Sequence, residues 1–191
     1  MRISGGQLKG RGITSRRLFS KKFEGDELRP TSSKVREAIF DILQNDIKDA
    51  DFLDLYAGTG TVGLEALSRG ADRVFLIEDN YIRSDAINKY IKEIKAADRV
   101  KCYRERVEYF LKRASAAGMR FNIIFADPPY ASDKIMKVLQ FIDEHDILKE
   151  DGCLIVEHSS KLDLPDDTKN LKFIKNYKYG DTMLTLYRKR R

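Results

Sequence analysis

The chain has 191 residues, of which 42% are apolar and 35% are charged, and its formal net charge is +6. This length and composition predict one globular domain with a sizeable core and argue against a disordered chain. The sequence shows neither an apolar run near the roughly 20 residues that span a bilayer nor a signal-peptide segment, so we expect a cytoplasmic protein without membrane contact.

The excess positive charge lies at the start of the chain. Residues 1–36 contain ten Lys or Arg and three acidic residues, a net of +7, so the rest of a chain with net +6 sums to −1. Glycines interrupt the basic residues, which favours a flexible or hairpin-like arm over residues 1–30. Such an arm neutralises phosphates, and we expect it to bind nucleic acid through Lys9, Arg11, Arg16 and Arg17. The alternative is a solvated tail. For the basic residues 188–191, a solvated tail and a phosphate-binding segment are equally well supported.

Helix and strand patterns alternate over residues 31–191, the expected main domain. A helix begins near residues 31–33, because apolar side chains follow at helical spacing from Val35 to Leu43. After Pro165, two strand-like runs around Gly180 and Asp181 predict an antiparallel hairpin at a sheet edge. Short apolar runs predict parallel strands at 51–56, 73–78, 99–103, 121–126 and 152–158. The expected fold is a doubly wound, Rossmann-like α/β sheet of about seven strands, mostly parallel.

The cysteines and histidines do not suggest a metal. Cys102 and Cys153 lie in apolar, strand-like runs without metal or redox spacing, which predicts buried thiols in a reducing cytoplasm. His145 and His158 are not spaced as a metal pair and are expected on the surface or at strand ends. We therefore expect no metal site.

A glycine-rich segment, DLYAGTGTVGLEAL, follows the first strand at residues 54–67. Gly58, Gly60 and Gly63 match the pattern G-x-G-x-x-G between a strand and a helix, and Glu78 ends the next strand. Glycines let a ligand approach the backbone, and a carboxylate accepts hydrogen bonds from two ribose hydroxyls. The pattern predicts a site for an adenosine-containing cofactor.

The acidic residues near this loop separate two such cofactors. The pyrophosphate of a dinucleotide would be repelled by a carboxylate close to the helix N-terminus. S-adenosylmethionine has no phosphate and carries a sulfonium and an ammonium group, which Asp54 and Asp127 favour. The pattern indicates a methyl donor and fits a hydride carrier poorly.

The fourth strand ends abruptly in FADPPY. Two adjacent prolines, Pro128 and Pro129, stop a strand and form a rigid lip at its carboxyl end, where open α/β sheets bind ligands. The alternative is a turn in which Tyr130 packs on the core and Asp127 caps the next helix.

These motifs resemble those of class I methyltransferases that modify exocyclic amino groups. RISGGQLKGRGI, LRPTSSKVREAIFDIL and YGDTMLTLY, at residues 2–13, 28–43 and 179–187, resemble one branch more closely. This branch is the bacterial small-subunit (16S) ribosomal RNA guanine-N2 methyltransferase family, of the RsmD type. The resemblance implies methyl transfer from S-adenosylmethionine to a guanine N2 amine of that RNA, in a partly or fully assembled small subunit. A monomer is expected.

The resemblance also implies roles for individual residues. Asp127 and the Pro128 carbonyl would accept hydrogen bonds from the amine, and Asp127 would secondarily accept its proton. Pro129 would hold the lip rigid and Tyr130 would stack on the extruded base. Asp79 would flank the adenine or cap the next helix. The remaining cofactor contacts would come from Asp54 at the methionine end, Tyr56, Ala57, Gly58, Thr59 and Gly60 around methionine and ribose, and Glu78 on the ribose.

Two parts of the resemblance are less regular. Arg106 stands where the family often has an acidic residue beside the adenine, so Glu105 or a backbone amide near Val107 would replace that contact. Arg29, Thr31 and Arg36 would stand near the mouth of the active site and contact RNA, although Arg36 could equally pair with an acid on its own helix.

Other functions fit parts of the pattern. A DNA adenine-N6 methyltransferase uses a similar tetrapeptide but usually needs an added recognition region. Protein-glutamine methyltransferases generally carry Asn in place of Asp127. A nonenzymatic RNA-binding module of the same fold would have little chemical reason to keep Asp54, Glu78 and Asp127 together. A dehydrogenase fits least.

Overall fold

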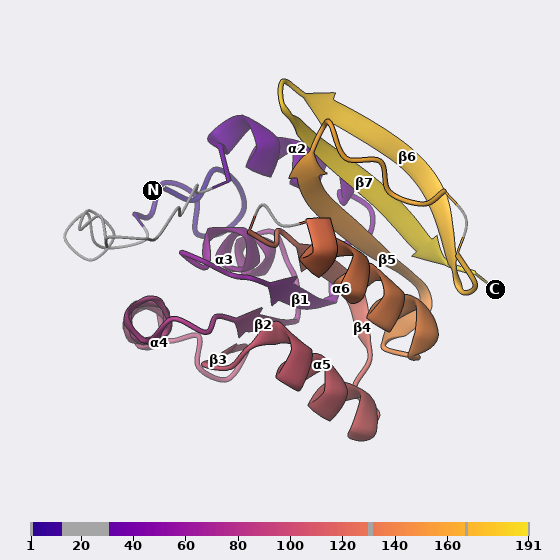
Figure 1. The fold of residues 1–191 in the computed structure, drawn as a ribbon. Coiled ribbons are helices and arrows are strands. Elements are labelled where there is room, and N and C mark those ends of the chain that lie inside the picture. Colours follow the sequence, from indigo (N-terminus) through magenta and orange to yellow (C-terminus); the bar gives the residue numbers. More distant parts are fainter. Residues whose placement is uncertain (1, 13–30, 130–131, 167, 191) are drawn as a thin grey trace.

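The computed structural model describes residues 2–12, 31–129, 132–166 and 168–190 (Figure 1). Its centre is a seven-stranded sheet in the order β3-β2-β1-β4-β5-β7-β6. The strands β1 (Asp51–Leu55), β2 (Arg73–Ile77), β3 (Val100–Tyr103), β4 (Phe121–Ala126) and β5 (Leu148–Ser159) are mutually parallel. The predicted doubly wound α/β sheet is confirmed.

The last two strands form the predicted antiparallel hairpin. β6 (Leu171–Tyr179) and β7 (Thr182–Lys189) pair with each other, and β7 pairs antiparallel with β5, so the hairpin completes one side of the sheet. Gly180 occupies the turn with a φ of 63°, a left-handed conformation that glycine adopts without strain.

Helices cover both faces of the sheet, because each parallel crossover returns over one face or the other (Figure 1). The face that includes Phe52, Leu76 and Ile155 packs against α2 (Ser33–Ile42), α3 (Thr61–Ser68) and α4 (Tyr81–Glu93). The other face, with Leu53 and Ile124, packs against α5 (Val107–Ala116) and α6 (Ser132–Glu144). Side chains alternate between these two cores along each central strand.

Residues 2–12 are folded against the main domain. Arg2 pairs with Gly12 across a short hairpin, and the Ile3 side chain is buried in the core beside α2 and α3. Ser68 of α3 anchors the hairpin: its carbonyl accepts a hydrogen bond from the Gln7 N–H at 2.8 Å. The first part of the predicted arm is therefore hairpin-like and packed. Residues 13–30, including Arg16, Arg17 and Arg29, lie outside the described residues.

Arg36 corrects the sequence prediction. Its guanidinium is only 3% exposed and pairs with Glu65 of α3 at 2.6 Å, so it does not face an RNA surface. The alternative prediction, a pair with an acidic residue of the same helix, is also wrong, because Glu65 belongs to α3 and Arg36 to α2. Ser4 and Arg69 contact the same carboxylate, and these partners outweigh the effect of burial and lower the pKa of Glu65. This buried cluster joins the N-terminal hairpin, α2 and α3.

We expect Arg36→Ala to lower the free energy of unfolding by about 3 kcal/mol, because a buried carboxylate loses its most buried partner. Urea denaturation of the variant measures this change. The Glu65 cluster stabilises the folded state fully above the ordinary pKa of glutamate, and this stabilisation is lost as the pH falls through the lowered pKa of Glu65. The unfolding free energies of the variant and the wild type should therefore converge in acid. Lys89→Ala, which breaks an exposed pair with Asp85, is the control and should leave stability unchanged. Equal stability of Arg36→Ala and wild type would contradict a structural role.

Candidate active site

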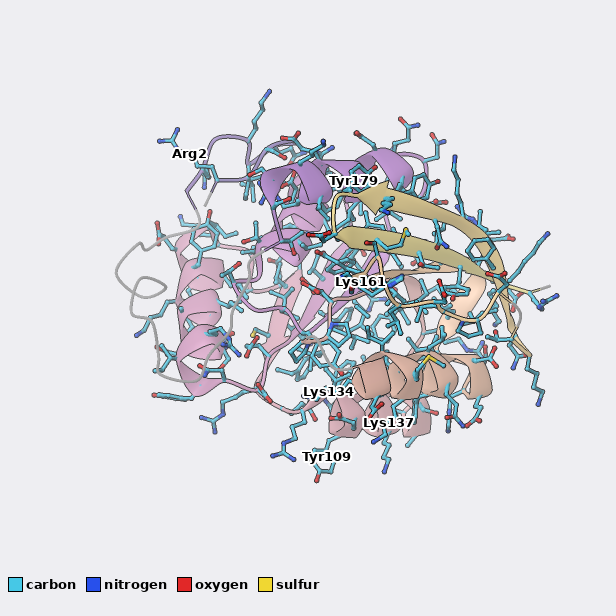
Figure 2. The ribbon with its side chains drawn as sticks, turned by 45° about the horizontal axis from the view of Figure 1, so that its top comes forward. Arg2, Tyr109, Lys134, Lys137, Lys161 and Tyr179 are labelled. Atoms are coloured by element: carbon cyan, nitrogen blue, oxygen red, sulfur yellow. The ribbon has the colours of Figure 1, made fainter. Side chains whose placement is uncertain are left out.

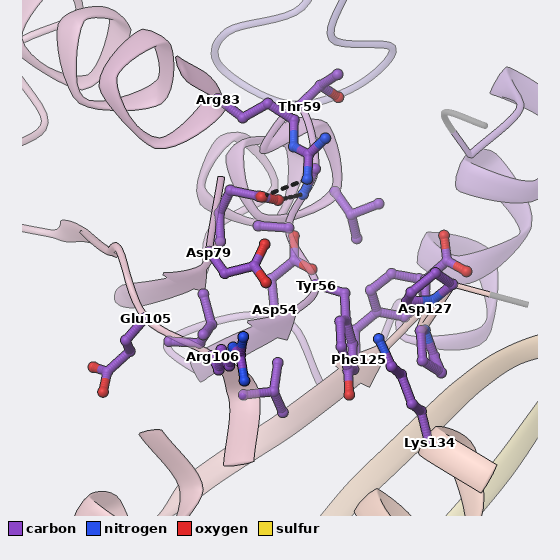
Figure 3. Close-up of a pocket in the computed structure, with 18 of the residues that line it drawn as sticks. Asp54, Tyr56, Thr59, Asp79, Arg83, Glu105, Arg106, Phe125, Asp127 and Lys134 are labelled. Atoms are coloured by element: carbon purple, nitrogen blue, oxygen red, sulfur yellow. Dashed lines mark hydrogen bonds and ion pairs between the residues drawn. The ribbon is translucent and has the colours of Figure 1, made fainter. Parts of the chain in front are cut away.

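A cavity of about 940 Å³ opens at the carboxyl ends of the parallel strands (Figure 3). Each of β1, β2, β3 and β4 contributes the residues that follow its last position, because parallel strands end at the same edge of the sheet. The cavity brings together twelve of the predicted site residues: Thr31, Asp54, Tyr56, Ala57, Gly58, Thr59, Glu78, Asp79, Val107, Asp127, Pro128 and Pro129.

The glycine-rich loop forms one wall of the cavity. Tyr56, at the end of β1, has a φ of 65°, an unusual backbone conformation for a non-glycine residue and one that often marks a functional site. Gly60 lies behind the wall as the N-cap residue of α3, with a φ of 71°. A Cβ atom on Gly63 would lie 2.2 Å from a methyl carbon of Leu76, so only glycine lets α3 pack this closely on β2.

Asp54 is buried beneath this loop. Its side chain is 1% exposed and accepts a hydrogen bond from the Gly63 N–H at 3.0 Å. Burial raises the pKa of Asp54 to about 8; the Gly63 hydrogen bond opposes this rise, and the nearby Asp127 and Glu78 add to it. Burial therefore favours the protonated acid near neutral pH, and a cation beside Asp54 would favour its carboxylate.

Glu78 stands at the end of β2 and is already well anchored. One oxygen accepts from the Gly58 N–H at 2.8 Å, and the other accepts from the Asn80 N–H at 2.9 Å and pairs with Arg83 at 2.7 Å. Figure 3 shows the Arg83 side chain reaching from α4 to the cavity wall. Glu78 thus fixes the glycine loop to β2 while facing the cavity.

Asp79 is exposed and lines the cavity. One of its two predicted roles was to cap α4, and it does not do so. Asn80 is the N-cap residue, and its side chain accepts hydrogen bonds from the Ile82 and Arg83 N–H groups. Only the position beside the cavity remains for Asp79.

The wall expected to face adenine is formed by the start of α5. Val107 is buried, and Arg106 precedes it as an N-cap residue without a side-chain capping bond. Glu105 was one candidate for adenine recognition, but its carboxylate forms an ion pair with Arg113. The Tyr56 hydroxyl is buried without a hydrogen-bond partner in the described part of the chain. These features favour a ligand that offers polar atoms to this wall, including to the first amides of the helix.

The lip forms the opposite side of the cavity. Pro128 is buried and Pro129 is exposed, so the chain leaves the sheet where predicted. Asp127 faces the cavity near Thr31. Burial raises the pKa of Asp127 to about 7, and a hydrogen bond with the Thr31 side chain opposes this rise. Lys134 of α6 also lines the cavity (Figure 3). Tyr130 lies outside the described residues.

The other predicted residues lie away from the cavity. Lys9 and Arg11 are exposed on the N-terminal hairpin, as a phosphate-binding role requires. Cys153 is a buried free thiol, whereas Cys102 is only partly buried. His158 is the last residue but one of β5, as the strand-end alternative predicted, and it is buried, where it contacts the Thr185 hydroxyl at 2.6 Å.

Several residues near the site were not singled out from the sequence, among them Arg83, Lys134 and Glu157. Arg83 and Lys134 lie on helices whose inward faces depend on packing, and no local pattern identifies them. Glu157 is different, because it stands near the carboxyl end of a predicted strand, as Glu78 does. Its position beside Asp127 follows only once β4 and β5 are known to be neighbours.

The described residues hold no group of three or more His, Cys, Asp or Glu that could bind a metal ion. None of the described helices is long and apolar enough to cross a membrane.

Comparisons with known proteins identify the family of this chain. A family model described as "Conserved hypothetical protein 95" matches residues 1–188. "Putative rRNA methyltransferase YlbH" from Bacillus subtilis is 33% identical over 190 residues, which cover 100% of both chains. "Ribosomal RNA small subunit methyltransferase D" from Escherichia coli is 30% identical over 189 residues, covering 99% of this chain and 90% of the relative.

Solved structures share the fold. "Putative methyltransferase yhhF from Escherichia coli" superposes with a TM-score of 0.84 at 31% identity, covering 99% of this chain and 97% of the other. A Thermus thermophilus structure described as "16S rRNA N2 G1207 methyltransferase (RsmC) in complex with AdoMet and Guanosine" has a TM-score of 0.68 and 20% identity, over 88% of this chain and 45% of the other, and shows the fold alone. The full-length matches establish that this chain belongs to the conserved hypothetical protein 95 family, together with the ribosomal RNA small subunit methyltransferase D proteins.

Proposed function

We propose that this protein transfers a methyl group from S-adenosylmethionine to the exocyclic N2 amine of a guanine in small-subunit ribosomal RNA. The observation that carries the proposal is the shared cavity. Asp127 and Pro128, which suit an amine, line the same cavity as the glycine loop, Asp54 and Glu78. The names of the full-length relatives support ribosomal RNA methylation.

The cavity suits the cofactor chemically. Asp54, Glu78, Asp79 and Asp127 surround it with carboxyl groups, which would repel a pyrophosphate and attract the ammonium and sulfonium groups. Glu78 keeps lone pairs for ribose hydroxyls, and the buried Tyr56 hydroxyl lacks a partner within the described residues. When bound, S-adenosylmethionine supplies a methyl group on a positively charged sulfur.

The lip supplies the acceptor side of the reaction. A guanine N2 amine is a weak nucleophile because its lone pair is delocalised into the ring. Hydrogen bonds from the amine to the Asp127 carboxylate and the Pro128 carbonyl would turn that lone pair toward the methyl carbon. Methyl transfer would form the carbon–nitrogen bond and break the sulfur–carbon bond, whose electrons would stay on sulfur. Asp127 or water would then accept the proton that the amine loses.

A base in a duplex cannot enter such a cavity, so the target must be in an open loop or flipped out, at a cost of a few kcal/mol. Contacts beside the mouth would offset this cost. Figure 2 shows Lys134 and Lys137 of α6 and Tyr109 of α5 projecting from the same side of the molecule, and Lys134 and Tyr109 line the cavity. We propose this side, with the N-terminal arm, as the RNA-binding surface. We propose residues 1–30 as an RNA-binding extension of the main domain, on which residues 2–12 pack.

The test is transfer of radiolabelled methyl from S-adenosylmethionine to small ribosomal subunits from cells that lack this gene. DNA and a release-factor protein serve as parallel acceptors. We expect label in the RNA, recovered as N2-methylguanosine. Label in DNA or protein would replace the acceptor, and absence of label in all three would favour a nonenzymatic module. Protein-free RNA and assembled subunits, assayed side by side, test the proposed preference for the particle.

Joint replacement of Lys9, Arg11, Arg16 and Arg17 by alanine should weaken RNA binding and lower the slope of log affinity against log salt by up to about 3, because four phosphate contacts release counterions. Filter binding at several salt concentrations measures the slope. The control replaces four exposed lysines on other elements: Lys92, Lys101, Lys172 and Lys178. Equal slopes for the arm variant and the wild type would make the arm a solubility tail.

A further inference from the structure

A second carboxyl group lies beside Asp127 at the lip. β4 and β5 are parallel, with Ala126 opposite Val156, so the next pair in register is Asp127 and Glu157. In-register side chains of parallel neighbours point to the same face, with backbones about 4.8 Å apart. That face is the one on which Phe125 and Ile155 pack toward α2 and α3. The two carboxyl groups therefore form a pair at the carboxyl end of the sheet.

Glu157 has an unused acceptor. Its Oε2 atom is buried and accepts no hydrogen bond within the described part of the chain. A small hollow of about 100 Å³ is lined by Glu157 together with Asp127 and Pro128. His158 in the same hollow is engaged with Ser159 and Thr185. A buried acceptor without a donor lowers the stability of the fold by about 1–3 kcal/mol. A contribution to stability therefore does not account for a glutamate at this position.

The electrostatics agree with this geometry. Burial raises the pKa of Glu157 to about 8 and the neighbouring Asp127 adds to the rise, while the Thr31 hydrogen bond opposes it. A donor from a bound ligand would satisfy the oxygen and favour the carboxylate.

Guanine presents such a donor beside its amine. Its N1–H and N2 amine are adjacent donors on one edge, whereas adenine has an acceptor at N1. We infer that Glu157 accepts the hydrogen bond from the guanine N1–H while Asp127 and Pro128 accept those from N2, so that Glu157 selects guanine among amino-bearing bases. This inference rests on the proposed function. It assigns Glu157 a role in specificity, distinct from the orienting role of Asp127.

The test compares guanine with 2,6-diaminopurine, which keeps the N2 amine but has an acceptor at N1. After the methylated position has been mapped, small subunits are reconstituted with either base there. kcat/KM is measured just above pH 8, because the raised pKa of about 8 favours protonated Glu157 at lower pH. We expect the wild type to prefer guanine by about 10- to 100-fold, as for loss of one good base contact. Glu157→Gln can donate to the N1 acceptor, so its preference should shrink to a few-fold or invert.

Two further variants serve as controls for the role of Glu157. Glu157→Asp retains a carboxylate and should keep the preference for guanine, even if its rate falls. Glu150→Gln, an exposed change near the other end of the same strand, should change neither the rate nor the preference. An equal loss on both substrates in Glu157→Gln, or an unchanged preference, would overturn the role of Glu157 and leave guanine methylation standing. If the wild type formed no N2-methylguanosine, the proposed function itself would fail.

Discussion

Replacement of Asp127 by alanine is expected to lower the rate of methyl transfer by about 10³-fold or more and to leave the affinity for S-adenosylmethionine within a few-fold of the wild type. The reason is the position of Asp127 on the lip, across the cavity from the glycine loop, where it would orient the acceptor amine. Loss of one preorganised hydrogen-bond partner commonly costs 10²- to 10³-fold in rate, and here the orienting group is removed completely.

Glu78→Ala is the matched control, because it removes a carboxylate from the opposite wall of the same cavity. It should weaken cofactor binding strongly, since Glu78 lines the cavity, where it would bind the ribose, and also accepts the hydrogen bond from the Gly58 N–H. Calorimetric titration gives the affinities, and single-turnover assays at saturating cofactor give the rates. The reverse pattern, with Asp127→Ala defective in binding and Glu78→Ala defective only in rate, would overturn both assignments.

Asp127→Asn separates the two roles proposed for this side chain. Asparagine keeps an acceptor oxygen for the amine but cannot take its proton. If orientation dominates, we expect this variant to retain much more activity than Asp127→Ala. A rate as low as that of the alanine variant would make proton acceptance the main contribution.

The fold was predictable from the sequence because its signals are local. The apolar runs mark the parallel strands, Gly58 and Gly60 mark the turn into α3, and the Asp127–Pro129 segment marks the end of β4. The structure confirms each of these elements and brings their carboxyl ends to one cavity. Local spacing suffices where the chain itself sets the geometry.

The contacts that the sequence did not predict are those between distant segments. Arg36 reads as an exposed basic residue until α2 is placed on α3, where Glu65 neutralises it. Glu157 reads as a strand residue until the register of β4 and β5 sets it beside Asp127. Both cases depend on tertiary neighbours, and residues far apart in the sequence have no periodicity that reveals their contact.

The row of carboxyl groups across β1, β4 and β5 has a consequence for stability. Asp54, Asp127 and Glu157 all have raised pKa values, to about 8, 7 and 8, and in each case burial is the main cause. A folded protein that holds protons which the unfolded chain releases becomes less stable as the pH rises. These three buried acids therefore lower stability near neutral pH, and a bound cationic cofactor would offset part of that loss.

Asp54→Asn should reveal this cost. Asparagine can still accept the hydrogen bond from Gly63 but carries no charge, so we expect the empty variant to be more stable than the wild type near pH 7, by about 1–3 kcal/mol. For the wild type, stability should fall as the pH rises from the ordinary aspartate pKa toward about 8 and then level off. Urea denaturation of the empty protein over this range measures both effects.

The same substitution should have the opposite effect on cofactor binding. Below about pH 8 the empty protein holds a proton on Asp54 that must leave before the carboxylate can stabilise a cation. The affinity of the wild type for S-adenosylmethionine should therefore rise between pH 6 and 7.5, by at most about tenfold per pH unit. Asp54→Asn should bind more weakly and with a flatter dependence on pH in calorimetric titrations. If the variant instead lost stability and kept the wild-type pH dependence, Asp54 would serve mainly to anchor α3, and the charge that the cofactor meets would have to come from Asp127 or Glu78.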